Sequence, residues 1–411
     1  MTGARLGPEE PIHLRETGQG VRCRLRTAQA ETLKKYGKVV GVERLGEDDW
    51  RVTGKQRVGL VRLGHGRGTV DLRIEPKLKI SKLMFLIGYA SGDPWWEEEA
   101  DWSWGSGLET AMAGVYARSV RRSLNGGVLH GYRAVEEDLP FVRGRVRTTD
   151  QARRTGLPLP VAVAYDDFTA DIAENRILLT ALHRLERLPD VPWRLRSALR
   201  HLVDRLPNVT PLRTGTPLPP WTPTRFNARY VPALRLAEQV LTDRSLSPDY
   251  GATAPPLVGS GILLDLSAVF EHFLGHALRE TTKPHGIKCR MQETHHLDTR
   301  GRLRMNPDVL CYRGGHPLAA VDAKYKILGE TPKREDIYQM VGYCVALGVR
   351  QAHLVHATAG NGGVPRPYEI RQAGITIDVR ALDLSRRPAE ILREVSRLAE
   401  HIASSPARRG S

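Results

Sequence analysis

Alternating apolar and polar positions mark the first part of the chain. The stretches "KVVGVERLGEDDWRVTGKQRVGLVRLG" and "GTVDLRIEPKLKI" change regularly between the two kinds of residue and are interrupted by Gly and Asp. Successive side chains of a strand leave opposite faces, so a period of two predicts strands with one buried face. We therefore expect a β-rich module within residues 1–90.

A helical period replaces this alternation in the middle of the chain. Residues 107–124, "GLETAMAGVYARSVRRSL", have the spacing of a helix. Between 171 and 206, leucines step by four and three in two segments separated by Pro189 and Pro192, which predicts two amphipathic helices packed as in a bundle. A further helix at about 232–244 leads to "SPDYGATAPPLVGSG", the best candidate for an interdomain linker.

Aromatic and basic side chains gather in two other segments. "SGDPWWEEEADWSWGSG" places four tryptophans among acids and glycines, which fits either a contact surface or a loop folded over its own core. The strand-like "YRAVEEDLPFVRGRVRTTDQARR" carries a set of arginines, namely Arg143, Arg145, Arg147, Arg153 and Arg154. These arginines either follow phosphates or form a solvated face, and both interpretations stay open.

The C-terminal part begins with a helix that buries one side. "LDLSAVFEHFLGHALRETT" has an apolar face, and Pro284 ends it. Strand-like "IKCRMQETHHL", "MNPDVLCYRG" and "PLAAVDAKYKI" follow, then helical "KREDIYQMVGYCVALG" and a further strand, "QAHLVHA". The chain is thus predicted to be a multidomain protein of mixed α+β and α/β class. We expect a β-rich N-terminal domain over 1–165, a helical connecting region over 166–250 and an α/β domain over 251–405.

Two carboxylates and one lysine interrupt the apolar strands of this last domain. Asp322 and Lys324 are two residues apart, so their side chains leave the same face, and Asp308 joins them if its strand pairs with the 317–327 strand. The two carboxylates and the carbonyl of Ala323 would supply the hard oxygen ligands that Mg²⁺ prefers, with Mn²⁺ as an alternative ion. An adjacent ammonium can orient or activate water and stabilise charge on a phosphate. These residues predict a centre that cleaves phosphodiesters; a structural ion pair is the alternative.

The same residues resemble the PD-(D/E)XK nuclease pattern. Pro307 and Asp308 form its first element, and Asp322 to Lys324 form its second; the two aspartates are 14 positions apart. The resemblance implies a restriction-endonuclease-like α/β fold for residues 251–405.

Three further residues extend this resemblance. Glu271 lies on the preceding helix, where the superfamily often has another metal-ligating carboxylate. Gln339 and Tyr343, four apart on one helical face, match the Q-x-x-x-Y element of RecB-type nucleases. The alternatives are a solvated Glu271 and a half-buried polar pair on the helix surface.

The charge of the chain points to a polyanionic partner. It has 61 Lys and Arg against 46 Asp and Glu, a formal net charge of +15. Such an excess usually indicates nucleic acid, although an Arg-rich proteome would account for part of it. No run approaches the roughly 18 uncharged apolar residues of a membrane span, and the start lacks the apolar core of a signal peptide. We expect DNA as a partner, no membrane segment and a cytoplasmic location.

The four cysteines suggest no cross-linking. Cys23, Cys289, Cys311 and Cys344 lie far apart in the sequence, without a C-x-x-C pair or a histidine at zinc-finger spacing. Neither a disulfide framework nor a structural zinc is predicted. We expect plain core or surface thiols.

Beyond the motifs, the chain is similar over about residues 60–385 to McrC, the nuclease subunit of modification-dependent McrBC restriction systems. The resemblance rests on "LRIEPKLKISKLMFLIGYA", "FVRGRVRTTDQ", "YDDFTADIAENRILLTAL", "VFEHFLGHAL", "NPDVL", "VDAKYK" and "DIYQMVGYC". It implies a metal-dependent DNA endonuclease in the C-terminal half. It also implies an N-terminal half that docks onto a ring-forming McrB-like AAA+ GTPase and stimulates its nucleotide hydrolysis, while that partner reads 5-methylcytosine. The first 20 or so residues and the tail "SSPARRGS" lie outside the similarity and look disordered.

The chain has no G-x-x-x-x-G-K-[ST] phosphate loop, in agreement with that division of labour. "GHGRG" at 64–68 lacks the lysine and predicts a hairpin turn. Two other functions stay open: a stand-alone RecB-like nuclease for DNA repair or phage defence, and a non-catalytic adaptor that activates an AAA+ motor. The presence of Asp308, Asp322 and Lys324 together argues against the adaptor.

Overall fold

The computed structural model describes residues 10–16, 18–92, 107–154, 159–213, 216–241, 261–325, 332–360 and 366–405. By their contacts, the described residues up to Ala111 and from Gly261 onwards form one unit, and the described residues from Met112 to Leu241 form another. The domain boundaries expected at 165 and 250, and the roles given to the three parts, stay predictions. The four tryptophans and the linker near residue 250 lie outside the described residues. Among the residues described, no helix is long and apolar enough to cross a membrane.

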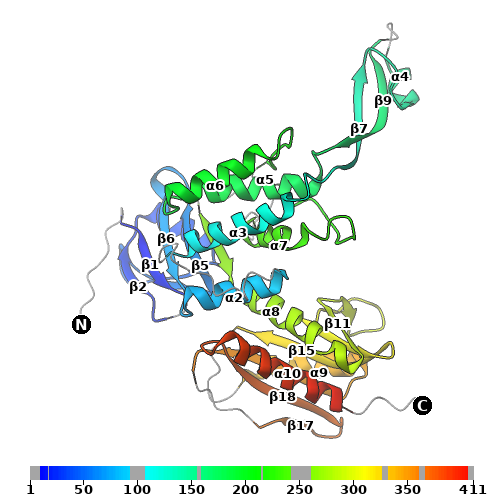
Figure 1. The fold of residues 1–411 in the computed structure, drawn as a ribbon. Helices are drawn as coiled ribbons and strands as arrows, with labels where there is room; N and C mark the ends of the chain where they lie inside the picture. Colours follow the sequence, from blue (N-terminus) through cyan, green and yellow to red (C-terminus); the bar gives the residue numbers. More distant parts are fainter. Residues whose placement is uncertain are drawn as a thin grey trace. The chain divides into compact units, whose positions relative to one another are not determined.

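Two small sheets form the N-terminal part of the first unit (Figure 1). The first contains β2 (Val21–Arg24), β4 (Asp49–Gly54) and β3 (Val40–Arg44), next to α1 (Thr27–Lys35). The second has the order β1 (Ile12–Arg15), β6 (Val70–Glu75), β5 (Arg57–Leu63) and β10 (Ile262–Asp265), and α2 (Ile80–Ser91) follows β6 in the chain. The antiparallel β5–β6 pair confirms the hairpin turn at 64–68. The expected N-terminal disorder is wrong from Ile12 onwards, because Ile12 and Leu14 are buried where β1 pairs with β6.

Strand β10 joins the N-terminal sheet to the C-terminal region of the same unit. Ile262 pairs with Leu60, and Asp265 pairs with Arg57, in an antiparallel register. Gly59 has a φ of +131°, and a Cβ at this position would lie 1.9 Å from the Ile262 carbonyl oxygen, so the close approach requires glycine. Since β10 leads directly into α8 (Leu266–Thr281), the N-terminal sheet fixes the start of that helix.

A six-stranded sheet dominates the C-terminal region. Its order is β11 (Ile287–Met291), β14 (Val309–Arg313), β15 (His316–Lys324), β16 (Gln351–Thr358), β18 (Ile375–Asp383) and β17 (Tyr368–Ile370). The β15–β16 and β16–β18 pairs are parallel, and the other pairs are antiparallel. A small hairpin of β12 (His295–His296) and β13 (Arg304–Met305) precedes β14. Apart from this hairpin, the predicted order of helix, three strands and helix is confirmed.

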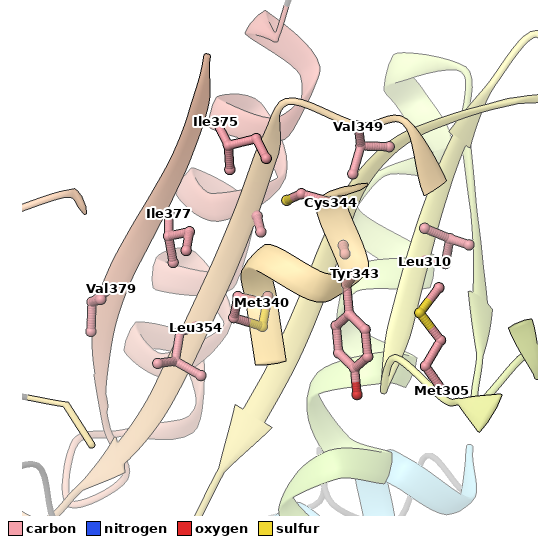
Figure 2. Packing of buried hydrophobic residues seen from close by; sticks show 12 residues of the cluster. Met305, Leu310, Met340, Tyr343, Cys344, Val349, Leu354, Ile375, Ile377 and Val379 are labelled. Carbon is pink, nitrogen blue, oxygen red and sulfur yellow. The ribbon is translucent and has the colours of Figure 1, made fainter. Parts of the chain in front are cut away.

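Helices cover both faces of this sheet. On one face, α9 (Arg334–Leu347) packs Met340 against strand residues that include Leu354, as Figure 2 shows. On the other face, Val355 of β16 lines a small cavity together with Leu274 of α8 and Leu398 of α10 (Pro388–Ser404). Parallel strands buried on both sides are apolar almost throughout. A charged side chain within them is therefore exceptional.

The second unit combines helices with a long ribbon of strands. The helices are α3 (Leu108–Leu124), α5 (Ala173–Glu186), α6 (Trp193–Asp204) and α7 (Val231–Leu241). The predicted helical leucines are buried, for example Leu182 of α5 and Leu199 of α6. In the ribbon, β7 (Gly131–Leu139) pairs with β9 (Val161–Thr169), which also pairs with β8 (Arg145–Val146), next to α4 (Thr148–Ala152). Figure 1 shows this ribbon extending away from the helices of its unit.

Acidic residues of the ribbon hold several of its arginines. Arg143 pairs with Asp167 at 2.7 Å, and Arg154 pairs with Asp138 at 2.6 Å. Arg147 contacts further acids on the same ribbon. These ion pairs favour the solvated-face interpretation over a row of phosphate ligands.

Candidate active site

The two aspartates meet at the open end of the β14–β15 hairpin. Val309, which begins β14, pairs with Val321 of β15. Asp308 and Asp322 are therefore one residue beyond this pair on neighbouring strands. Asp308 Oδ2 accepts a hydrogen bond from the backbone N–H of Ala323 at 2.8 Å. The strand pairing on which the predicted site depends is present.

Asp322 and Lys324 share one face of β15. Asp322 is only 2% exposed, and its Oδ2 lies 2.5 Å from Lys324 Nζ. Lys324 Nζ also donates to Gln339 Oε1 at 3.1 Å. The ammonium is thus held between a strand carboxylate and a helix amide, and Gln339 joins the predicted site through it.

Tyr343 extends the polar contacts along α9. Gln339 Nε2 donates to Tyr343 Oη at 2.8 Å, and the Tyr343 hydroxyl donates to the Asn306 carbonyl at 3.3 Å. Figure 2 shows the phenol oxygen directed away from the apolar cluster. Burial raises the pKa of Tyr343, and the charges of the two aspartates add to this shift, so the hydroxyl stays protonated and can donate. Asn306 directly precedes the Pro-Asp element, so α9 is anchored to both halves of the motif.

The ionisation of the site reflects its burial and its crowded charges. Burial raises the pKa of Asp308 to about 6, and the charge of Asp322 adds to the shift, while the Ala323 N–H and Lys324 oppose it. For Lys324, burial lowers the pKa, but the neighbouring carboxylates more than offset this effect and raise it overall. The lysine is therefore an ammonium at neutral pH.

Glu271 on α8 belongs to the same electrostatic neighbourhood. It is half-buried; burial raises its pKa to about 7, and the charges of Asp308, Asp265 and Asp322 add to the rise. A hard divalent cation relieves such crowding because it favours the ionised carboxylates. The oxygen-rich donor set therefore fits Mg²⁺. The ligand roles of Glu271, Asp308, Asp322 and the Ala323 carbonyl stay predictions.

Asp265 is part of this neighbourhood although the motif analysis missed it. Its side chain caps α8 by accepting from the backbone N–H groups of Ser267 at 3.1 Å and Ala268 at 3.3 Å. It also pairs with Arg57 of β5 at 2.8 Å. An aspartate directly before a helical pattern is an N-cap signal, which could have identified the cap. The ion pair spans 208 positions, and no local pattern indicates it.

The residue after Lys324 is held by the N-terminal sheet. Gln56 Nε2 donates to the Tyr325 carbonyl at 2.6 Å, and the Tyr325 hydroxyl donates to Glu16 at 3.2 Å. Glu16 is 3% exposed, and burial raises its pKa. These contacts fix the end of β15, so the N-terminal sheet positions the strand that carries Lys324.

Comparison with known proteins adds a family and a fold. A family described as McrBC 5-methylcytosine restriction system component matches residues 52–357. A search of curated proteins found no match. A chain from the refined half-complex of the tetradecameric assembly of Thermococcus gammatolerans McrB AAA+ hexamers with bound McrC is similar at TM-score 0.55 and 17% identity, over 96% of this chain and 100% of that one. A chain from the cryo-EM structure of the Thermococcus gammatolerans McrBC complex has a TM-score of 0.38 and 18% identity, over 66% of this chain and 88% of that one.

Proposed function

The chain belongs to the family of McrBC 5-methylcytosine restriction system components, and we propose that it is the metal-dependent DNA endonuclease subunit of such a system. The observation that carries the proposal is the convergence of Asp308, Asp322 and Lys324 at the end of one hairpin. A structural ion pair needs one acid for one lysine. Here a second aspartate and Glu271 add negative charge in a half-buried place, which favours a metal centre over an ion pair.

The residues of the site have distinct roles in this proposal. Asp308, Asp322 and Glu271 would hold Mg²⁺, together with the carbonyl of Ala323. A bound Mg²⁺ supplies Lewis acidity, which polarises a phosphate and makes a bound water more acidic. Lys324 orients the attacking water and stabilises the negative charge that develops on the phosphoryl oxygens. A new P–O bond forms from water, the ester P–O bond breaks, and the leaving oxygen takes up a proton.

The surroundings of Lys324 support this role. Gln339 fixes the ammonium at 3.1 Å, and Tyr343 in turn fixes Gln339 at 2.8 Å. The Ala323 N–H fixes Asp308 in the same way. Groups that are held before substrate arrives lose less entropy in the transition state. The polar contacts on α9 are therefore positioning contacts.

We infer that an McrB-like AAA+ GTPase docks on the second unit, and that this chain stimulates its GTP hydrolysis. Large apolar side chains are exposed along the ribbon, with Tyr132 at 77%, Phe168 at 61% and Phe141 at 59%. Exposed apolar groups on such a ribbon are typical of protein contact surfaces. A solved structure of a similar fold is described as McrB hexamers with bound McrC, which supports a partner of this kind.

A cleavage assay tests the proposed function. Full-length protein is incubated with Mg²⁺, GTP and DNA, with or without 5-methylcytosine, in the presence or absence of the GTPase partner. We expect cleavage of the modified DNA only when the partner is present, and none with Asp308→Ala. Cleavage of both DNAs without the partner would favour the stand-alone nuclease. Stimulated GTP hydrolysis without cleavage would favour the adaptor.

A further inference from the structure

A second polar cluster lies on the opposite face of the six-stranded sheet. His353 of β16 is in register with Asp378 of β18, and α10 brings His401 next to them. Asp322 is in register with Leu354, so its neighbour His353 points to the other face. The two histidines are 48 positions apart on different elements, and no local spacing links them.

The potential ligand atoms converge. Asp378 Oδ2 lies 2.9 Å from His401 Nε2 and 3.5 Å from His353 Nδ1, and the three atoms all lie within 4.8 Å of one another. Ligands at about 2.1 Å from a tetrahedral zinc are roughly 3.4 Å apart. The two separations from Asp378 Oδ2, 2.9 and 3.5 Å, are of this size.

His353 lacks the partners that a buried imidazole normally has. Its side chain is 0% exposed, and neither ring nitrogen has a hydrogen-bond partner among the described residues. The 3.5 Å approach to Asp378 is too long for a good hydrogen bond. One ring nitrogen of a neutral imidazole has a lone pair that can bind a metal ion.

The hydrogen-bond contacts of His401 Nε2 cannot all be satisfied at the same time. Its Nε2 lies 2.9 Å from Asp378 Oδ2 and 2.8 Å from the amide nitrogen of Gln351, which is 3.1 Å from the same carboxylate oxygen. One imidazole nitrogen cannot donate to Asp378 and accept from Gln351 at the same time. A cation between His401, His353 and Asp378 would use all three lone pairs and leave Gln351 as a donor to the carboxylate.

We propose that His353, Asp378 and His401 bind a divalent transition-metal ion, with zinc as the best match, and that the ion fastens α10 to β16 and β18. Two imidazole nitrogens and one carboxylate suit zinc and similar ions, whereas Mg²⁺ prefers oxygen ligands throughout. The side chain of His401 is 41% exposed, which gives an ion access from solvent. The cysteine spacing indicated no structural zinc, and this site uses no cysteine.

Zinc titration of metal-free, full-length protein against a chromogenic chelator tests the site. We expect one ion per chain and a higher melting temperature with zinc. His401→Gln and Asp378→Asn should each weaken binding at least about 10-fold. His401 is partly exposed, so its variant should fold. His285→Gln changes an exposed histidine of the same unit and should leave the affinity unchanged.

The same titration can overturn the proposal. Absence of binding by the wild type would do so, and so would equal affinities of the wild type, His401→Gln and Asp378→Asn. Zinc binding should also persist in Asp322→Asn. Loss of binding in that variant would place the ion among the acids of the other face and contradict the assignment. Failure of the zinc site would leave the proposed nuclease function untouched, because its test measures DNA cleavage with Mg²⁺.

Discussion

The two faces of the six-stranded sheet carry polar clusters of different chemistry. On the α9 face, Asp308 and Asp322 offer only oxygen ligands, next to the ammonium of Lys324. On the other face, His353 and His401 offer nitrogen ligands around a single carboxylate. Oxygen ligands suit a hard, exchangeable ion, and imidazoles suit an ion that is held tightly. Under the two proposals above, one sheet separates a reactive centre on the α9 face, the reactive face, from a fastening site on the opposite face. Lys324 lies on the reactive face, next to Asp322, where it would act on substrate.

Removal of Lys324 should lower the cleavage rate strongly and leave the zinc site on the opposite face unchanged. We predict that Lys324→Ala lowers the single-turnover cleavage rate by about 100-fold or more, the scale of losing a positioned electrostatic or acid–base group. Zinc affinity should stay at the wild-type value. Lys288→Ala, an exposed change on β11 of the same sheet, is the matched control and should cleave normally. A folded Lys324→Ala protein with normal cleavage would make Lys324 a structural residue.

The two faces should also differ in their response to pH. The pKa values of Asp308 and Glu271 are raised to about 6 and about 7, from ordinary values of 3.8 and 4.5. Protonated carboxyls bind Mg²⁺ poorly, so its affinity should fall about 10-fold between pH 8 and pH 6. Glu271→Gln should remove the part of this dependence near pH 7. Calorimetric Mg²⁺ titrations at several pH values provide the measurement, and a flat profile would contradict the charge crowding.

The same pKa shifts predict the pH dependence of stability. Because the folded-state pKa values are raised, the two acids contribute stability that is fully present below the unfolded pKa values. This contribution is lost as the pH rises through about 6 and about 7. The metal-free protein should therefore melt a few degrees higher at pH 6 than at pH 8 on account of these groups. Added Mg²⁺ should reduce this difference between the melting temperatures at pH 6 and pH 8. A melting temperature insensitive to Mg²⁺ at pH 8 would count against these ligands.

Loss of a positioning contact should have a smaller effect on cleavage. Gln339→Ala removes the amide that holds Lys324, and we expect a rate about 10-fold lower with an unchanged KM. Tyr343→Phe removes only the outer hydroxyl and should cost less. A variant that changes KM and leaves kcat unaltered would instead place Gln339 in substrate binding. A purely structural role predicts lower stability with normal single-turnover chemistry.

Contacts from the N-terminal sheet should affect the free energy of unfolding more than the cleavage rate. Arg57→Ala breaks a pair in which the two side chains are only 12% and 26% exposed, and we expect a loss of about 2 kcal/mol in the free energy of unfolding. Arg62→Ala on the same strand breaks a pair whose arginine is 57% exposed, and should cost less than about 1 kcal/mol. Urea unfolding of both variants makes the comparison. Equal losses would show that the half-buried Arg57–Asp265 pair stabilises the protein no more than the exposed Arg62–Asp71 pair does.

The sequence predicts more of the arrangement around Asp308 and Asp322 than of the other contacts in the fold. Asp308 and Asp322 lie on two strands joined by a short turn, so local alternation was enough to place them together. The contact of Gln56 with Tyr325 spans 269 positions, and β10 has only four residues, so neither could be predicted from local periodicity. The N-terminal strand Ile12–Arg15 was missed for the same reason, since its partner β6 is remote. His353 and His401 were missed because a strand and a helix bring them together only in the fold.

The most direct test compares two aspartates of one sheet, each changed to asparagine. Asp322 lies on the α9 face and Asp378 on the opposite face, and each change removes one charge with little change in shape. In single-turnover cleavage of DNA containing 5-methylcytosine, with Mg²⁺ and the GTPase partner, Asp322→Asn should lose about 1,000-fold or more in rate. Asp378→Asn, once shown to be folded, should cleave near the wild-type rate. Cleavage at the wild-type rate by a folded Asp322→Asn protein would contradict the assignment of the nuclease centre.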